Sequence, residues 1–356
     1  MTARVRNAVR GLGVDPVVVP ALGLVLVLVV VGASQSGNFL SSYNISNVLI
    51  QVTPLLLVAL GQMFVVASGG LDLAVGGTVS LVTVVIAVTA GDLGLPLALA
   101  LGLCTGLLVG VVNGLAVSWG LDAFLTTLAT FSVAQGVALL ILETPGGEVP
   151  RSFGDVAGFF GGPGGVVPVA LPIVLVVAAG AALVLHRTGL GLHILAVGSN
   201  RNTARLAGVR ERRALLGAYV LSAFACVLAG IFLTARTLGG DPTGGSNLTL
   251  DSLAVVVLGG TALAGGRATV LGTVIAALAI GLLSNVMNLL QFPSYWQTPA
   301  KGVVVILAVA LPSLALMWAA RRRRRALTNE YVSESPPQAV PPAQGAGGNH
   351  GAPSLG

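Results

Sequence analysis

Long apolar segments, with few charged residues inside them, follow one another through most of this 356-residue chain. A helix of about 20 apolar residues crosses the ~30 Å hydrocarbon core of a bilayer. We therefore expect an all-α polytopic membrane protein with about ten transmembrane helices. The expected spans lie at about 16–33, 47–68, 72–90, 94–118, 123–142, 166–186, 214–235, 250–264, 268–290 and 299–319.

The amino-acid composition excludes several classes of soluble protein. Charged residues make up 8% of the chain, whereas soluble domains carry ~25%. The formal charge of +6 does not indicate nucleic-acid binding, because removing the five arginines of the run Arg321–Arg325 lowers it from +6 to +1. Cys104 and Cys226 lie inside apolar segments, where helix packing accounts for them better than a disulfide or a metal site. A soluble enzyme, a nucleic-acid-binding protein and a disulfide-rich secreted module are excluded.

The two ends of the chain differ from the region between them. Residues 1–15 form a basic segment that we expect in the cytoplasm. A cleaved signal peptide also begins this way, but the apolar stretch is long for one and more spans follow, so a retained first helix is favoured. We assign 16–320 to the transmembrane domain and 321–356 to an arginine-rich membrane anchor followed by a disordered tail rich in proline and glycine.

The distribution of arginine predicts how the helices are oriented. The loop 187–213 contains six arginines and a single acid, Glu211. The loops 143–165 and 236–249 together carry four acids against two arginines. Because Lys and Arg accumulate in cytoplasmic loops, both ends of the chain are predicted to lie in the cytoplasm, in agreement with an even number of spans.

Two glycine-rich segments predict interrupted helices. Residues 61–82 and 250–274 each place two glycine pairs between apolar stretches. We expect short or broken helices near 69–77 and 250–266, as in transporters built from internal repeats. The similarity of the two segments has a simpler alternative explanation, which is their shared richness in glycine and valine.

The sequence lacks the residues that ATP hydrolysis or metal chemistry would need. A nucleotide-binding P-loop has the pattern G-x-x-x-x-G-K-[ST], and the chain's one lysine, Lys301, lies in TPAKGVV. The three histidines, His186, His193 and His350, have no metal-binding spacing with cysteines or acids. We expect no catalytic residue, metal or cofactor in this chain, and any ATP hydrolysis that it depends on belongs to another polypeptide.

Polar residues inside the spans are candidates for a solute pathway. A charged side chain at the bilayer centre costs about 3 kcal/mol on insertion scales. For Asp72 and Asp251 we favour capping of a helix start, and for Lys301 anchoring at the membrane surface. Hydrogen bonding between helices explains most uncharged polar residues in membrane proteins. The candidate pathway residues are Gln62, Asp72, Asn113, Thr127, Asn285 and Asn288.

The basic loop between the sixth and seventh spans is too long for a hairpin turn. Ser199 and Asn200 can cap a short helix that begins near Arg201, and Gly208 can end it. A short amphipathic helix on the cytoplasmic side is either a docking surface for a partner or an interfacial helix on anionic lipid. The composition of the loop leaves both possibilities open.

One motif in this loop, Asn202-Thr203-Ala204-x-x-x-Gly208, resembles the EAA-type loop of bacterial ABC-importer permeases. The preceding GLG, AVG and Asn200 resemble its monosaccharide branch, the ribose-, xylose- and arabinose-type permeases. Further segments also resemble this branch, and together they cover about residues 45–311. They are GQMFVVASGGLDLAVGG at 61–77, NGLAVSWGLDAFLTTLATFSVAQGVALL at 113–140, AVVVLGGTALAGGRATVLGT at 254–273, and SYWQ and KG at 294–302.

The resemblance implies a permease subunit of an ATP-binding-cassette importer in a bacterial-type cytoplasmic membrane. Such a subunit works as a homodimer and moves a monosaccharide or related polyol. An extracytoplasmic solute-binding protein would deliver the solute, and a cytoplasmic ATPase holding ATP and Mg²⁺ would engage the loop 188–213. The residues expected to contact the ATPase are Gly198, Asn200, Asn202, Ala204, Arg205 and Gly208.

The sequence departs from that family in two places, and other functions stay open. An acid usually stands where Asn202 or Thr203 is found, and the proline usual before the residue matching Phe124 is absent. Relatives of the same class move nucleosides, furanose autoinducers or branched-chain amino acids. The alternatives outside the class are an ion-coupled secondary transporter that uses Asp72 or Asp251, and a membrane scaffold or receptor component.

Overall fold

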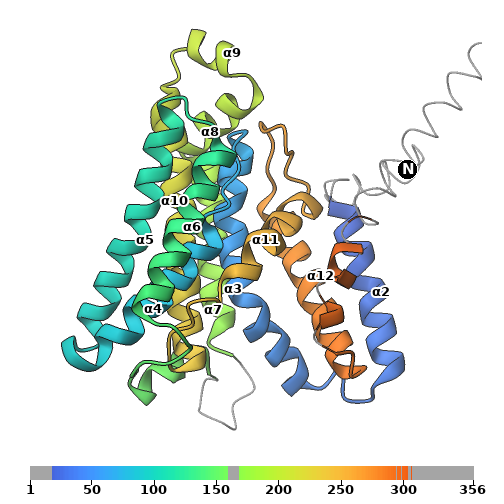
Figure 1. The fold of residues 1–356 in the computed structure, drawn as a ribbon. Helices are drawn as coiled ribbons and strands as arrows, with labels where there is room; N and C mark the ends of the chain where they lie inside the picture. Colours follow the sequence, from blue (N-terminus) through green and yellow to red (C-terminus); the bar gives the residue numbers. More distant parts are fainter. Residues whose placement is uncertain (1–17, 159–167, 294, 298, 304–305, 307–356) are drawn as a thin grey trace, which may run out of the picture.

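The computed structural model describes residues 18–158, 168–293, 295–297, 299–303 and 306, and this part is a bundle of helices without a β-sheet (Figure 1). The helices are α2 (Val19–Gln35), α3 (Ser42–Ala67), α4 (Val75–Leu93), α5 (Leu95–Ser118), α6 (Ala123–Ile141), the 3₁₀ helix η2 (Arg151–Ala157), α7 (Ala170–Arg187), α8 (Gly189–Ser199), α9 (Arg201–Leu206), α10 (Glu211–Thr237), α11 (Ser246–Leu258) and α12 (Val270–Leu289).

Nine of the ten expected spans coincide with a helix of the structure, which confirms an all-α polytopic membrane protein. Seven of these helices, α3 to α7, α10 and α12, are long and apolar enough to cross a membrane. Helices α2 and α11 are shorter, with 17 and 13 residues, so the short span expected at 250–264 is confirmed. The tenth expected span, 299–319, lies mostly outside the described residues, as do 1–15 and 321–356.

Local capping sets where the helices begin. The hydroxyl of Ser41 accepts the N–H of Asn44 (3.2 Å), so α3 begins five residues before the expected position 47. The carboxylate of Asp122 accepts the N–H of Leu125 (3.0 Å) at the start of α6. Each cap satisfies a backbone donor that has no partner within its own helix.

Helices α3 and α10 lie at the centre of the bundle (Figure 1). In the most apolar 18-residue stretch of each helix, 89% of the residues are buried in α3, against 22% in α5 and 17% in both α6 and α7. Large parts of α5, α6 and α7 therefore face outward from a single chain, where lipid or another protein covers them.

A stripe of glycines on α5 allows the close approach of α4 and α10. Glycine recurs there at every fourth residue, which places the glycines on one face of the helix. A Cβ atom at Gly110 would lie 2.9 Å from the carbonyl oxygen of Tyr219, and one at Gly114 would lie 3.0 Å from the Cα of Leu216. Small residues at this spacing let membrane helices pack backbone to backbone. The stripe consists of Gly102, Gly106, Gly110 and Gly114.

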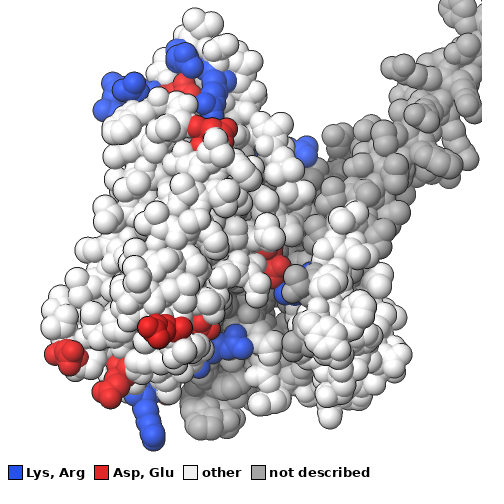
Figure 2. Space-filling model, in the orientation of Figure 1, with Lys and Arg blue, Asp and Glu red and all other residues white. Residues whose placement is uncertain are grey.

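The charges gather at the two ends of the bundle (Figure 2). Most of the Lys and Arg side chains on the visible face lie at the end that carries α8 and α9. Acidic side chains lie mainly at the opposite end, where α4 ends and η2 lies. This asymmetry supports the prediction that the α8–α9 end faces the cytoplasm.

Candidate functional site

The basic loop that the sequence singled out forms two short helices, α8 and α9. The hydroxyl of Thr188 accepts the N–H of Gly191 at the start of α8 (3.3 Å). The side chain of Asn200 accepts the N–H of Thr203 at the start of α9 (2.9 Å). Gly208 follows α9 with a φ of +79°, which favours glycine. The predicted cap at Asn200 and the predicted helix stop at Gly208 are therefore confirmed.

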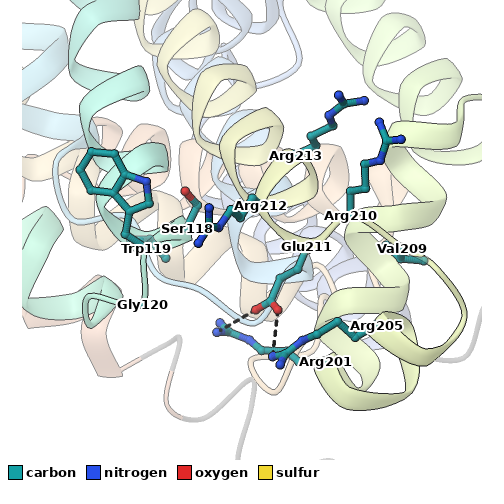
Figure 3. Close-up of a pocket in the computed structure, with 11 residues that line it drawn as sticks. Ser118, Trp119, Gly120, Arg201, Arg205, Val209, Arg210, Glu211, Arg212 and Arg213 are labelled. Carbon is teal, nitrogen blue, oxygen red and sulfur yellow. Dashed lines mark ion pairs between the residues drawn. The ribbon is translucent and has the colours of Figure 1, made fainter.

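Glu211 ties α9 to the start of α10 through two ion pairs (Figure 3). Its carboxylate lies 3.4 Å from a guanidinium nitrogen of Arg201 and 3.0 Å from one of Arg205. Because both arginines are about half exposed, each pair contributes only ~0–1 kcal/mol and weakens in salt. Together the pairs connect the start of α10 to a six-residue helix, which has little stability of its own. Sequence reasoning counted Glu211 as the single acid of the loop and missed this role.

An open pocket of about 700 Å³ lies between the end of α5 and the connection from α9 to α10. Among the described residues, none of the lining arginines Arg210, Arg212 and Arg213 forms an ion pair, so the surface is basic. Two large apolar side chains are exposed beside these charges, Trp119 by 68% and Leu206 by 91%. We call residues 117–120 and 201–213 the α9 surface. Sequence reasoning missed Leu206, although a leucine in so basic a segment was a visible signal.

The end of α8 packs backbone against backbone on two other segments. A Cβ atom at Gly198 would overlap with the carbonyl oxygen of Ala67 and lie 2.7 Å from the nitrogen of Gly266. Gly266 donates its N–H to the same carbonyl (2.9 Å). A Cβ atom at Gly265 would lie 2.7 Å from the oxygen of Gly198 and 2.8 Å from the nitrogen of Gly69. We call Gly69, Gly198, Gly265 and Gly266 the glycine junction. A Cβ atom at any of the last three would lie less than 3 Å from the backbone of another segment.

Both segments that meet α8 are helix interruptions, which confirms the prediction near 69–77 and 250–266. One separates α3 from α4, and the other separates α11 from α12. The N–H of Gly70 reaches back to the carbonyl of Val65, and the N–H of Thr261 reaches back to that of Val256, each over 3.1 Å. The glycine before each donor has a φ of +79° or +89°. The two helix ends thus share Schellman-type geometry. Helices α5 and α9 end in the same way, so the internal repeat stays a prediction.

Asp72 lies buried in the first interruption. Its carboxylate accepts the hydroxyl of Ser222 (2.9 Å) and the N–H of Ala74 (3.0 Å). It therefore caps the turn before α4, whereas the helix itself has no side-chain cap. The predicted capping role of Asp72 is therefore confirmed for the turn before α4 and wrong for α4 itself. The hydroxyl of Tyr219 also donates to the carbonyl of Leu71 (3.0 Å), so the interruption is fastened to α10.

Three further candidate pathway residues lie buried inside the protomer. Asn113 accepts the hydroxyl of Thr130 (2.7 Å), and Asn285 exchanges two hydrogen bonds with Asn44 (2.9 and 3.1 Å). The hydroxyl of Thr127 accepts a backbone N–H of the first interruption (3.0 Å). In this conformation these side chains link helices of one chain, and their part in a pathway stays a prediction.

The last two candidate pathway residues are Gln62 and Asn288. Gln62 is fully buried, and neither atom of its amide has a hydrogen-bond partner among the described residues. Asn288 is exposed and accepts the amide of Gln297 (2.7 Å). Within the described part of the chain, no three His, Cys, Asp or Glu side chains form a group that could hold a metal ion.

Asp251 and Lys301 form an ion pair, with 2.9 Å between the ammonium nitrogen and a carboxylate oxygen. Helix α11 begins at Ser246, so Asp251 lies one turn inside it and not at its cap. The expected capping of a helix start by Asp251 is wrong, and sequence reasoning did not connect these two residues because they lie 50 positions apart.

Known proteins resemble the chain over most of its length. A family described as branched-chain amino acid transport system / permease component matches residues 44–309. No solved structure matches the chain.

Three curated relatives are similar over at least 80% of this chain. The ribose import permease protein RbsC of Bacillus subtilis is 38% identical over 297 residues, which is 82% of this chain and 91% of the relative. The protein of the same name from Escherichia coli K12 is 36% identical over 290 residues, covering 80% and 90%. The D-allose transport system permease protein AlsC of Escherichia coli K12 is 31% identical over 294 residues, covering 82% and 90%.

Proposed function

The chain belongs to the family described as branched-chain amino acid transport system / permease component, and we infer its function from this membership. The chain is a multi-pass transport subunit of the cytoplasmic membrane and the permease of an ABC importer. Its solute is a monosaccharide or a related polyol, with ribose the first to test. The observation that carries this proposal is 36–38% identity to ribose import permeases over at least 80% of the chain.

The α9 surface is the proposed docking site for a partner ATPase, which would bind ATP and Mg²⁺. Helix α9 projects beyond the ends of the long apolar helices (Figure 1), and its last residue, Leu206, is almost fully exposed. The unpaired arginines beside it favour an acidic partner. A protein partner accounts for both features better than a lipid surface does. The expected contacts stay Gly198, Asn200, Asn202, Ala204, Arg205 and Gly208, of which Gly198 lies in the glycine junction and Ala204 is buried. We add Leu206 to this proposal because it is exposed.

The glycine junction gives the α9 surface a route to the transmembrane core. Helix α8 directly precedes α9, and Gly198 near the end of α8 contacts both helix interruptions. Because closely packed protein interiors have low compressibility, a displacement of α8 would also displace both interruptions. The first interruption in turn holds Asp72, which is bonded to α10. ATP-driven movement of the loop would thus reach the centre of the bundle.

Two further partners follow from the same proposal. A second copy of the chain would pack on part of the outward-facing surface of α5, α6 and α7, with the solute crossing between the copies. An extracytoplasmic solute-binding protein would dock at the acidic end of the bundle (Figure 2). Ion-coupled transport has less support, because Asp72 accepts two hydrogen bonds and Asp251 is paired with Lys301.

Uptake of radiolabelled ribose by cells of the native host tests this function. We expect deletion of the gene to abolish high-affinity uptake and the wild-type gene to restore it. Unlabelled ribose should then compete strongly, allose less strongly, and leucine and adenosine not at all. Normal ribose uptake in the deletion strain, or competition by leucine or adenosine alone, would contradict a monosaccharide permease.

A further inference from the structure

The ion pair between Asp251 and Lys301 joins α11 to the helical residues 299–303. Lys301 is the chain's one lysine. The two side chains are 21% and 22% exposed, so the pair is not sealed inside the protein. The charges of the α9 surface, in contrast to this pair, lie at one end of the bundle (Figure 2).

The start of α11 lies deep in the bundle. Gly245, just before this helix, donates its N–H to the hydroxyl of Ser80 on α4 (2.9 Å). Ser80 precedes the end of α4 at Leu93 by 13 residues, which at ~1.5 Å per residue is ~20 Å. The hydrocarbon core is ~30 Å thick. Ser80 therefore lies inside the hydrocarbon core and not at its surface, and so does the start of α11. Asp251 lies one turn further along α11.

Holding these helices together does not require charges. Some other contacts between segments of the described bundle use neutral groups alone, as in the pair of Asn44 with Asn285 (2.9 Å) and of Ser246 with Gln135 (3.1 Å). Ions within the membrane are costly and tend to mark the path of a solute. Transporters often place a solute site beside interrupted helices, and α11 ends at the second interruption.

The polar surface continues from the pair along the same chain segment. Gln297 lies four residues before Lys301 in the chain, and both residues are helical. Its amide donates to Asn288 (2.7 Å), one of the candidate pathway residues. Carboxylate, ammonium and two amides together offer the donors and acceptors that sugar hydroxyls need. Because the charges of the pair cancel, the site suits a neutral solute.

We propose that Asp251 and Lys301 bind the solute within the membrane, the carboxylate accepting and the ammonium donating hydrogen bonds to its hydroxyl groups. The proposal rests on the proposed function, since it takes the solute to be a neutral polyhydroxylated molecule. The pair is then a specificity determinant that opens toward solute during each transport cycle.

Charge exchange tests the proposal in cells that lack the native gene. The variant Asp251→Lys with Lys301→Asp keeps an ion pair but reverses its direction, and Asp251→Asn with Lys301→Gln keeps neutral hydrogen bonding. We expect both double variants to reach the membrane and co-purify with the ATPase, while ribose uptake falls about tenfold or more, the effect of losing a hydrogen bond to a charged group. Normal ribose uptake by the exchanged pair would overturn the proposal and leave a purely structural link.

A protection measurement covers the case in which both double variants fail to assemble. Ala254→Cys, three residues after Asp251 on α11, leaves the ion pair intact. It is made in a Cys104→Ala background, because Cys104 is exposed and Cys226 is buried. D-Ribose should slow labelling by a charged thiol reagent, and L-ribose should not. Labelling that neither sugar slows would overturn the proposal. Failure of the wild-type gene to restore ribose uptake would instead reject the proposed function, so the two failures are distinguishable.

Discussion

Gly198 of α8 packs against the carbonyl group of Ala67 at the end of α3, and a Cβ atom at Gly198 would overlap with that oxygen. We predict that Gly198→Ala displaces α8 from both helix interruptions. Overpacking of this kind costs ~1–3 kcal/mol, so the thermal midpoint of the purified protein and the rate of ribose uptake should both fall. Gly189→Ala is the matched control on the same helix, because its Cβ meets nothing within 4 Å. Equal effects of the two substitutions would contradict the junction.

Leu206 is 91% exposed at the end of α9. Replacing it by Asp should abolish co-purification of the ATPase, because the change removes the apolar contact that the α9 surface offers. The thermal midpoint of the isolated chain should stay the same, since the side chain buries little surface there. Leu206→Met keeps an apolar side chain of similar size and should retain the ATPase. If as much ATPase co-purifies with Leu206→Asp as with the wild-type chain, the docking site lies elsewhere.

Gly208 has a φ of +79° and open space around its Cα. A side chain at Gly208 therefore costs ~1–2 kcal/mol of backbone strain without a clash. We predict that Gly208→Glu leaves the transmembrane helices folded but separates ATP hydrolysis from ribose uptake, because α9 is reoriented. Gly208→Asn tolerates this backbone conformation better and should keep more uptake. Unchanged uptake in Gly208→Glu would rule out a coupling role for this turn.

Gly110 lies in the glycine stripe of α5, where a Cβ atom would come within 2.9 Å of a backbone oxygen of α10. Gly110→Ala should lower stability by ~1–3 kcal/mol through overpacking. Gly136→Ala on α6 meets nothing within 4 Å and should leave stability unchanged or raise it slightly. Thermal unfolding in detergent compares the two, and a stable Gly110→Ala protein would mean that α5 and α10 are not closely packed.

Much of the fold was predictable because each span carries its own apolar signal. Local turn chemistry was also readable, as the caps at Asn200 and Gly208 show. The glycine stripe of α5 was visible in the sequence as glycine at every fourth residue, but its partner helix was not.

Contacts between distant segments could not be predicted from one sequence. Gly198 meets Ala67 and Gly266 only because three segments far apart in the chain converge. Asp251 and Lys301 each had a plausible local role, and only the packing of α11 against the last described helical segment pairs them. The candidate pathway residues were chosen for polarity, which does not distinguish a helix-to-helix hydrogen bond from a solute contact.

Energised uptake into vesicles tests the central claim most directly. The complex is purified from native membranes through this chain, reconstituted into proteoliposomes with its binding protein, and supplied with radiolabelled ribose. We predict uptake that requires ATP and Mg²⁺ on the side of the α9 surface and that a protonophore does not affect. Uptake without ATP, driven by a proton or sodium gradient, would contradict an ABC permease.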